Sequence, residues 1–209
     1  MDTADIERLL EPFAKLDQQQ LSLTSTYIDL LLKWNARINL TSVRDPQEIV
    51  TRHFGESFFV ARTLSARSFA STIDLGSGAG FPGLPLAILL PEVQVALIES
   101  NQKKSTFLRE VAFALKLQNT SVFSGRGEDH TGRGAVVTMR AVEQFQKALP
   151  VALGLVEQDG RIALMIGASQ VDEAVNLAPQ VGWHIPIPIP SGHSRVLLVG
   201  AKTVKGGAR

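Results

Sequence analysis

A glycine-rich segment between two apolar stretches constrains this chain more than any other part of its sequence. The segment TIDLGSGAGFPGLPLAI (residues 72–88) opens with a short apolar run, passes through several glycines and continues into an apolar helical pattern. Glycine adopts positive φ angles freely and, without a Cβ atom, lets a ligand lie against bare backbone. The first amides of the following helix then face that ligand. The pattern predicts a strand, a tight turn and a helix, with a small-molecule site at the carboxyl end of a parallel strand.

The spacing of the glycines narrows the class of ligand. A dinucleotide-binding turn reads G-x-G-x-x-G, and here Phe81 stands in place of the third glycine. The segment instead reads D-x-G-x-G-x-G from Asp74, and it looks like motif I of the class I S-adenosylmethionine (SAM) methyltransferases. The next apolar run, residues 93–98, ends at Glu99, an acid that can accept hydrogen bonds from a ribose diol.

The resemblance extends to further motifs in a fixed order. They are LLKWNARINLTSVRDPQEIVTRHF (31–54), DLGSGAGFPGLPLAI (74–88), ESNQKKSTFLREVAFALKL (99–117), GRGED (125–129) and MRA (139–141). Together they resemble the RsmG family, also called GidB, whose members methylate N7 of one guanosine in the 16S rRNA of the bacterial small ribosomal subunit. The resemblance covers about residues 21 to 165, and the joint pattern is far more specific than any single motif.

The resemblance implies a fold and a set of cofactor-binding residues. The fold is α/β, that of a class I SAM-dependent methyltransferase: a Rossmann-like, mostly parallel seven-stranded sheet with helices on both faces and an N-terminal helical extension. Asp74 and the glycine turn would hold the amino-acid end of SAM, Glu99 the ribose, and the Gly127–Glu128 segment the adenine. The full cofactor set is Asp74, Gly76, Gly78, Phe81, Glu99, Ser100, Gly127, Glu128 and Arg140.

Arg140 is the one residue expected to take part in catalysis. It ends the fourth predicted strand, next to the place where the methyl acceptor lies in this fold. Arginine stays charged at neutral pH, so it orients the cofactor, an RNA phosphate or the guanine edge and is no base. Guanine N7 has a free lone pair and carries no proton, so no general base is required.

Length, composition and charge bound the remaining possibilities. The chain has 209 residues, 44% of them hydrophobic and 20% charged, with a formal net charge of +1, as in ordinary globular proteins. We expect one compact unit: an N-terminal helical region (1–68) packed on a SAM-binding core (69–209).

A near-neutral chain can bind RNA only through a local basic patch. Residues 33–67 are rich in arginine, which indicates an RNA-facing surface or, equally well, an ordinary solvated helix face. The RNA-binding candidates are Arg37, Arg52, His53, Lys103, Lys104 and Arg126.

Several classes of site and location are not expected. The chain has no cysteine, which excludes disulfides and thiolate catalysis, and its four histidines lack metal-ligand spacing, so no metal is predicted. The acidic segment MDTADIERLL has no apolar region typical of a signal peptide, and no apolar run reaches the length of a membrane span. We expect a cytoplasmic monomer whose partner is the small-subunit RNA.

Periodicity and capping signals predict the order of the elements. Helices are expected at 2–16, 22–37, from Asp45 to about residue 66, and then alternating with strands. The strands are expected at 72–75, 93–98, 120–123, 135–139 and 161–166, followed by an antiparallel pair at 182–188 and 195–201. The basic, glycine-rich tail 202–209 is predicted to be mobile.

Three positions depart from the family pattern, and two other functions stay open. Glu56 stands where the family has aspartate in R-H-F-x-D-S, Met139 where it has serine, and Ile166 where it has lysine. The alternatives are an NAD-dependent oxidoreductase on the same architecture and a non-catalytic RNA-binding module. Phe81 argues against the first, and the intact glycine turn with Glu99 argues against the second.

Overall fold

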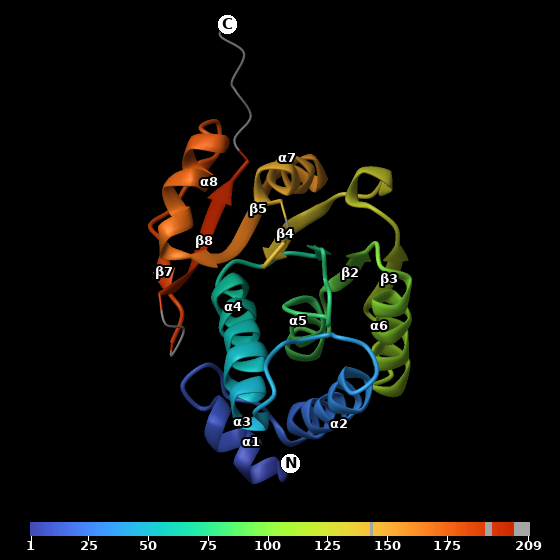
Figure 1. The fold of residues 1–209 in the computed structure, drawn as a ribbon. Coiled ribbons are helices and arrows are strands. Elements are labelled where there is room, and N and C mark those ends of the chain that lie inside the picture. The colour runs from blue at the N-terminus through green and yellow to red at the C-terminus, as the bar shows by residue number, and fades with distance from the viewer. Residues whose placement is uncertain (143, 191–193, 203–209) are drawn as a thin grey trace, which may run out of the picture.

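The computed structural model describes residues 1–142, 144–190 and 194–202. One mixed sheet runs through its centre, with strand order β3-β2-β1-β4-β5-β8-β6, and β7 also pairs with β8 (Figure 1). The strands are β1 (Ser71–Leu75), β2 (Gln94–Glu99), β3 (Thr120–Ser124), β4 (Gly134–Arg140), β5 (Val156–Gly167), β6 (Gly182–Trp183), β7 (Ile187–Pro188) and β8 (Arg195–Ala201). The tail predicted to be mobile lies, apart from Lys202, outside the described residues.

The sheet confirms the predicted alternation and corrects the number of strands. The strands β1 to β5 are parallel, and β8 runs antiparallel to β5. The single strand expected at 182–188 is two short strands, β6 and β7, each paired with β8. The described sheet therefore has eight strands rather than seven. Pro186 lies between the two pieces, and it has no N–H group to donate to a ladder.

Helices cover both faces of the sheet (Figure 1). They are α1 (Thr3–Leu10), α2 (Gln18–Asn35), α3 (Pro46–Glu48), the π-helical segment η1 (Ile49–Gly55), α4 (Glu56–Ser65), α5 (Gly83–Leu89), α6 (Gln102–Ala114), α7 (Phe145–Leu155) and α8 (Val171–Leu177), with short 3₁₀ turns η2 (Gly127–Asp129) and η3 (Ala168–Gln170). The predicted start at Asp45 is confirmed, because its side chain accepts a hydrogen bond from the Glu48 amide at 2.7 Å. The helix expected after it is interrupted by η1, and π-helical turns are frequent at functional sites.

Alternate residues of the central strands pack into two separate cores. On β5, Ala163 and Met165 face a cluster shared with α2, α4, α5 and α6. Ile162 and Leu164 face the opposite cluster, shared with α7 and α8. This period-two pattern is that of a parallel strand buried on both faces.

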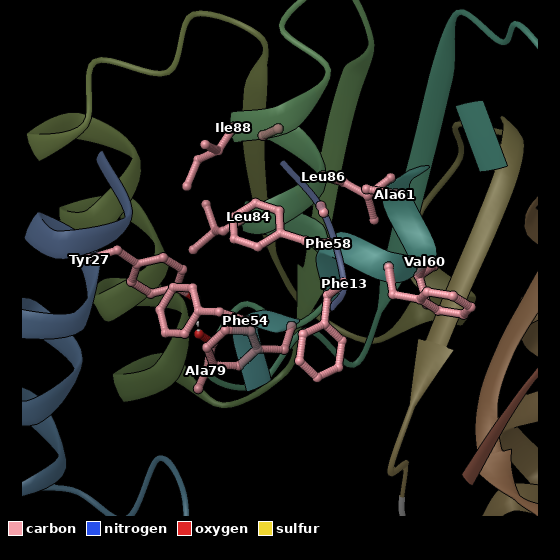
Figure 2. Close-up of a cluster of buried hydrophobic side chains, with 14 of the residues drawn as sticks. Phe13, Tyr27, Phe54, Phe58, Val60, Ala61, Ala79, Leu84, Leu86 and Ile88 are labelled. Carbon is pink, nitrogen blue, oxygen red and sulfur yellow. Dashed lines mark hydrogen bonds between the residues drawn. The ribbon is translucent and has the colours of Figure 1, made fainter. Parts of the chain in front are cut away.

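The N-terminal helices pack directly on the helix that follows the glycine turn. Figure 2 shows Phe13, Phe54 and Phe58 from the N-terminal region beside Leu84 and other apolar side chains of α5. These aromatic side chains are fully buried. Because burying a Phe side chain stabilises a fold by about 1.5–3 kcal/mol, this contact fixes the helical region against the helix that follows the glycine turn.

Candidate active site

The glycine turn has the backbone conformation that its sequence predicts. Gly76, Gly78 and Gly80 have φ angles of +71°, +57° and +93°, which side chains rarely tolerate. The amides of Gly76 and Ser77 both donate to the carbonyl of Ile98, at 2.9 and 3.0 Å, so the turn is tied to the end of β2. A Cβ atom at Gly76 would lie 3.1 Å from Val142, in the loop that follows β4.

Glu99 closes the connection between the turn and β2. Its Oε2 accepts from the Gly78 amide at 2.8 Å and its Oε1 from the Asn101 amide at 2.7 Å. Each carboxylate oxygen has further acceptor capacity, so the group predicted to take the ribose lies directly beside the bare backbone of Gly78.

Asp74 is buried below the turn and holds it from inside. Its Oδ1 accepts from the Thr138 hydroxyl at 2.7 Å, and its Oδ2 accepts from the Gly83 amide at 3.1 Å. Burial raises the pKa of Asp74 to about 6 against the opposing effect of these hydrogen bonds. The carboxylate therefore links the start of α5 to β4 beneath the turn.

Tyr27 joins the N-terminal region to the turn, a contact that no sequence motif indicated. Its hydroxyl donates to the carbonyl of Ala79, and both residues are labelled in Figure 2. Its ring stacks on Phe81, with centroids 5.5 Å apart, and burial raises its pKa well above the usual value. Phe81 also stacks on His53 at 5.0 Å, so the residue expected to pack on the cofactor is held by aromatic neighbours.

We expect Tyr27→Phe to weaken SAM binding about two- to tenfold, because a neutral hydrogen bond contributes about 0.5–1.5 kcal/mol. The phenyl ring keeps the stacking on Phe81 while the Ala79 carbonyl loses its donor. Calorimetric titration with SAM measures the effect, and Tyr27→Leu, which also removes the ring, should be weaker still. Equal affinity of Tyr27→Phe and the wild type would show that the hydroxyl does not set the turn.

Arg140 lies at the end of β4 within a cluster of polar groups. Its Nη2 atom is within hydrogen-bonding distance of the Arg52 carbonyl (2.9 Å), His53 Nδ1 (3.2 Å) and Glu56 Oε2 (3.2 Å). Burial lowers the pKa of Arg140 to about 10, and the charge of Glu56 opposes that shift. The guanidinium is therefore fixed by the N-terminal helices and remains charged at neutral pH. Its Cζ atom lies 5.9 Å from the centre of the Phe81 ring.

The partners of His53 determine its tautomer. A guanidinium only donates, so Nδ1 accepts from Arg140, and Nε2 carries the proton that it donates to the Thr41 hydroxyl at 2.7 Å. Burial, followed by the charge of Arg140, lowers the pKa of His53 to about 3. His53, an RNA-binding candidate, is thus neutral and has both nitrogens engaged.

Most of the other predicted site residues lie around the same edge of the sheet. Ser100 and Glu128 are exposed, whereas Gly127 is buried, and a Cβ there would meet Leu75 and Val151 at 2.6 and 2.8 Å. Among the cationic candidates, Arg37, Arg52, Lys103 and Arg126 are exposed and Lys104 is half-buried. The lysines begin α6 after β2, and Arg126 follows β3, so these three belong to the carboxyl edge where Arg140 ends β4.

The arginine-rich stretch 33–67 does not form one surface at the site. Arg52 contacts Arg140 through its carbonyl at the carboxyl edge. Arg67 accepts from Arg161, and Arg161 is paired with Ala201 at the other end of β5 and β8. The chain from Arg52 to Arg67 is almost continuously helical and runs from one edge of the sheet to the other. Only part of this charge can face a ligand at the carboxyl edge.

Two further residues were missed from the sequence as members of the site. Glu56 is buried, and its two oxygens bind Arg140 and Arg195, the first residue of β8. The only signal for Glu56 was its place in the family's R-H-F-x-D-S motif, and Arg195 had none. The other departures, Met139 and Ile166, are buried in the core against α7 and α8 and belong to the packing on that side.

The described residues contain no helix that is both long and apolar enough to cross a bilayer. In the same part of the chain, no three His, Cys, Asp or Glu side chains are grouped so that they could hold a metal ion.

Solved structures with a similar fold include methyltransferases. The chain resembles magnesium protoporphyrin IX methyltransferase from Synechocystis PCC 6803 with bound SAM, with a TM-score of 0.65 and 13% identity over 91% of this chain and 99% of that one. It also resembles a ribosomal protein L11 methylase from Lactobacillus delbrueckii subsp. bulgaricus, with a TM-score of 0.61 and 11% identity over 73% of this chain and 79% of that one. At these identities the likeness shows the fold, that of a class I methyltransferase.

Sequence comparison identifies the family. A ribosomal RNA small subunit methyltransferase G of Roseiflexus sp. (strain RS-1) is 38% identical over 90% of this chain and 86% of its own length. The protein of the same name from Xylella fastidiosa (strain M23) is 36% identical over 94% of both chains. The family model described as rRNA small subunit methyltransferase G matches residues 20–185. The chain therefore belongs to the GidB family of rRNA small subunit methyltransferases.

Proposed function

We propose that this protein transfers the methyl group of SAM to N7 of one guanine in 16S rRNA. Membership of the GidB family makes it a SAM-dependent methyltransferase of small-subunit rRNA. The observation that carries the proposal is the arrangement at the carboxyl edge of the sheet. There the Gly78 amide binds Glu99, and Arg140 is fixed by Glu56 at the end of β4.

The residues at this edge fit SAM. Gly76 and Gly78 present bare backbone at positive φ, and the Glu99 carboxylate beside them can accept further hydrogen bonds from a ribose diol. The buried Nη1 atom of Arg140 has no hydrogen-bond partner in the protein. We assign the cofactor to these residues together with Asp74, Phe81, Ser100 and the Gly127–Glu128 segment.

The chemistry of the site agrees with attack by a nitrogen that has no proton to lose. When bound, SAM supplies an electrophilic methyl group on a sulfonium centre. Both ring nitrogens of His53 are engaged and its pKa is about 3, so it is not placed to accept a proton at neutral pH. Arg140 is charged and fixed, and its task is orientation of the reacting groups.

Exposed cations around the same edge support RNA as the acceptor. Lys103 and Arg126 are exposed at the carboxyl ends of β2 and β3, and Arg52 is exposed beside Arg140. We propose that these residues, with Arg37, His53 and Lys104, contact the small ribosomal subunit. We also propose a cytoplasmic monomer in which region 1–68 and core 69–209 act as one unit, since Tyr27 of the first holds the turn of the second.

Methyl transfer to ribosomal particles tests the function directly. Purified protein is incubated with labelled SAM and small subunits from cells that lack the endogenous enzyme, and the modified base is identified by mass spectrometry. The expected result is one 7-methylguanine per particle, with a rate that falls steeply with salt because phosphate contacts supply affinity. Particles from wild-type cells are the control and should accept no further methyl group. Equal methylation of free guanosine, without salt dependence, would contradict an RNA substrate.

A further inference from the structure

Two arginines from distant parts of the chain share one buried carboxylate. Glu56 begins α4, and its side chain is 2% exposed; its Oε2 binds Arg140 at 3.2 Å, and its Oε1 binds Arg195. Arg140 ends β4, and Arg195 begins β8, where it pairs with Gly167 at the end of β5. Because β8 is antiparallel to β5, its first residue lies at the same edge as the last residue of β4.

Among the described residues, Glu56 is the one carboxylate in ion-pair contact with the two arginines of this cluster. The side chains of Arg140 and Arg195 are only 10% and 23% exposed, and together they carry two positive charges against the one negative charge of Glu56. His53, which also contacts Arg140, is neutral. The charge of Asp74, buried beneath the turn, also acts on Arg140, but among the described residues Asp74 forms no ion pair with either arginine. A single carboxylate in contact with two guanidinium groups leaves donors of both without an acceptor.

The hydrogen bonds of the two guanidinium groups are also incomplete. All three acceptors of the Arg140 side chain lie around Nη2, and Nη1 has none. Arg195 reaches Glu56 through Nη2, and its Nε has no partner. Within the described residues, only four buried side-chain polar atoms lack a partner; two are threonine hydroxyls, and the other two are these guanidinium nitrogens. An unsatisfied buried donor costs about 1–3 kcal/mol, and more when it is charged.

We propose that Arg140 and Arg195, organised by Glu56, form an oxyanion-binding pair in which Arg195 is a ligand-binding residue of the reaction. The ligand chemistry is an anionic oxygen, supplied either by a phosphate of the RNA next to the target base or by the carboxylate of SAM. Guanidinium groups bind both kinds of oxyanion through charge-assisted hydrogen bonds. The proposal rests on the proposed function for the identity of these two sources, and it deepens that function by adding Arg195 to the site.

Two variants of Arg195 and one matched control test the pair. Arg195→Gln removes the charge, whereas Arg195→Lys keeps a charge for Glu56 and loses the Nε–H donor. Arg161→Gln is the control, because Arg161 lies at the opposite edge of the same β5–β8 pair and contacts the Arg67 carbonyl and the Phe69 ring. Each protein is titrated with SAM by calorimetry and assayed on small subunits over a range of salt concentrations. Protection by inorganic phosphate against thermal unfolding, at constant ionic strength, is measured in parallel.

The two sources give different results. If the RNA phosphate is the ligand, Arg195→Gln raises the KM for particles tenfold or more and reduces the salt slope by about one, with SAM affinity unchanged. If the carboxylate of SAM is the ligand, the SAM dissociation constant rises tenfold or more instead. In both cases Arg195→Lys shows a smaller loss of affinity than Arg195→Gln, and Arg161→Gln shows no loss.

An unchanged KM, salt slope and SAM affinity in both Arg195 variants would overturn the pair and leave Arg195 as a structural partner of Glu56. The phosphate measurement separates this outcome from failure of the proposed function, because it needs no methyl transfer. Wild-type protein without activity but with Arg195-dependent protection by phosphate would refute the function and keep the pair. Protection that is equal in the wild type and in Arg195→Lys would count against the Nε–H donor and hence against the pair.

Discussion

Replacing Arg140 with alanine is expected to lower the rate of methyl transfer by about a hundredfold or more, because misplaced reacting groups cost rates of this order. Nη2 of Arg140 joins three groups of the N-terminal region: the Arg52 carbonyl, His53 Nδ1 and Glu56. The Nη1 atom of the same guanidinium is buried and has no hydrogen-bond partner in the protein. Alanine removes both the positioning contacts and the free donor at the end of β4.

Lysine at position 140 is expected to recover little of this rate. An ammonium group is a compact charge without the planar fork, so it cannot contact three acceptors and still present a separate donor. The experiment is single-turnover methyl transfer at saturating SAM for both variants, with thermal unfolding to confirm that each is folded. Arg161→Gln again serves as the control for loss of a half-buried arginine. A rate close to wild type in folded Arg140→Ala would remove Arg140 from the reaction and leave it a structural residue.

Acid is expected to destabilise the protein through His53, by about 3 kcal/mol between pH 7.5 and pH 4. The pKa of His53 is lowered from 6.5 in the unfolded chain to about 3 in the folded protein by burial and by the charge of Arg140. The unfolded chain therefore binds a proton that the folded protein rejects. The stability from neutral His53 is fully present above pH 6.5 and is lost as the pH falls toward 3.

Asp74 has the opposite effect on stability over nearly the same pH range. Its folded pKa is about 6 against 3.8, so the folded protein takes up a proton first and gains stability as the pH falls from 6 toward 4. The two contributions partly cancel in the wild type, and only variants separate them. We measure the free energy of unfolding against pH for the wild type, His53→Asn and Asp74→Asn.

The free energies of unfolding of the two variants should change with pH in opposite senses relative to the wild type. The difference in stability between wild type and His53→Asn should narrow by about 3 kcal/mol from pH 7.5 to pH 4, since asparagine does not titrate. Asp74→Asn should lose more stability in acid than the wild type does. A constant difference for His53→Asn across this range would mean that His53 is protonated at its ordinary pKa and that the Arg140 contact does not hold it neutral.

The sequence by itself determined the fold and the local backbone conformation of the glycine turn. Gly76, Gly78 and Gly80 predict positive φ angles, because only glycine adopts such angles without strain. The structure has positive φ at all three positions. Asp45 predicts the start of a helix, because an aspartate side chain at this position accepts a hydrogen bond from the amide three residues later. Such signals depend on neighbours in the chain, so they can be found in a single sequence.

Tertiary structure alone decided how the site is held. The Tyr27 hydroxyl meets the Ala79 carbonyl across 52 positions, and the Arg195 guanidinium meets Glu56 across 139. Nothing in the sequence around Tyr27 or Arg195 indicates these partners. A buried polar group forms hydrogen bonds with whichever groups the folded chain brings close to it. The same holds for the Asp74 carboxyl group, which accepts hydrogen bonds from the Thr138 hydroxyl and the Gly83 amide beneath the turn.

The basic stretch at residues 33–67 shows where sequence information ends and tertiary structure is needed. From sequence, residues 33–67 form one basic stretch, but the helical path from Arg52 to Arg67 carries it from the carboxyl edge of the sheet to the opposite edge. Composition counts charges along the chain, whereas binding depends on which of them share a surface. That division is decided by how η1 and α4 cross the sheet, a geometry fixed by the packing of Phe54 and Phe58 in the core.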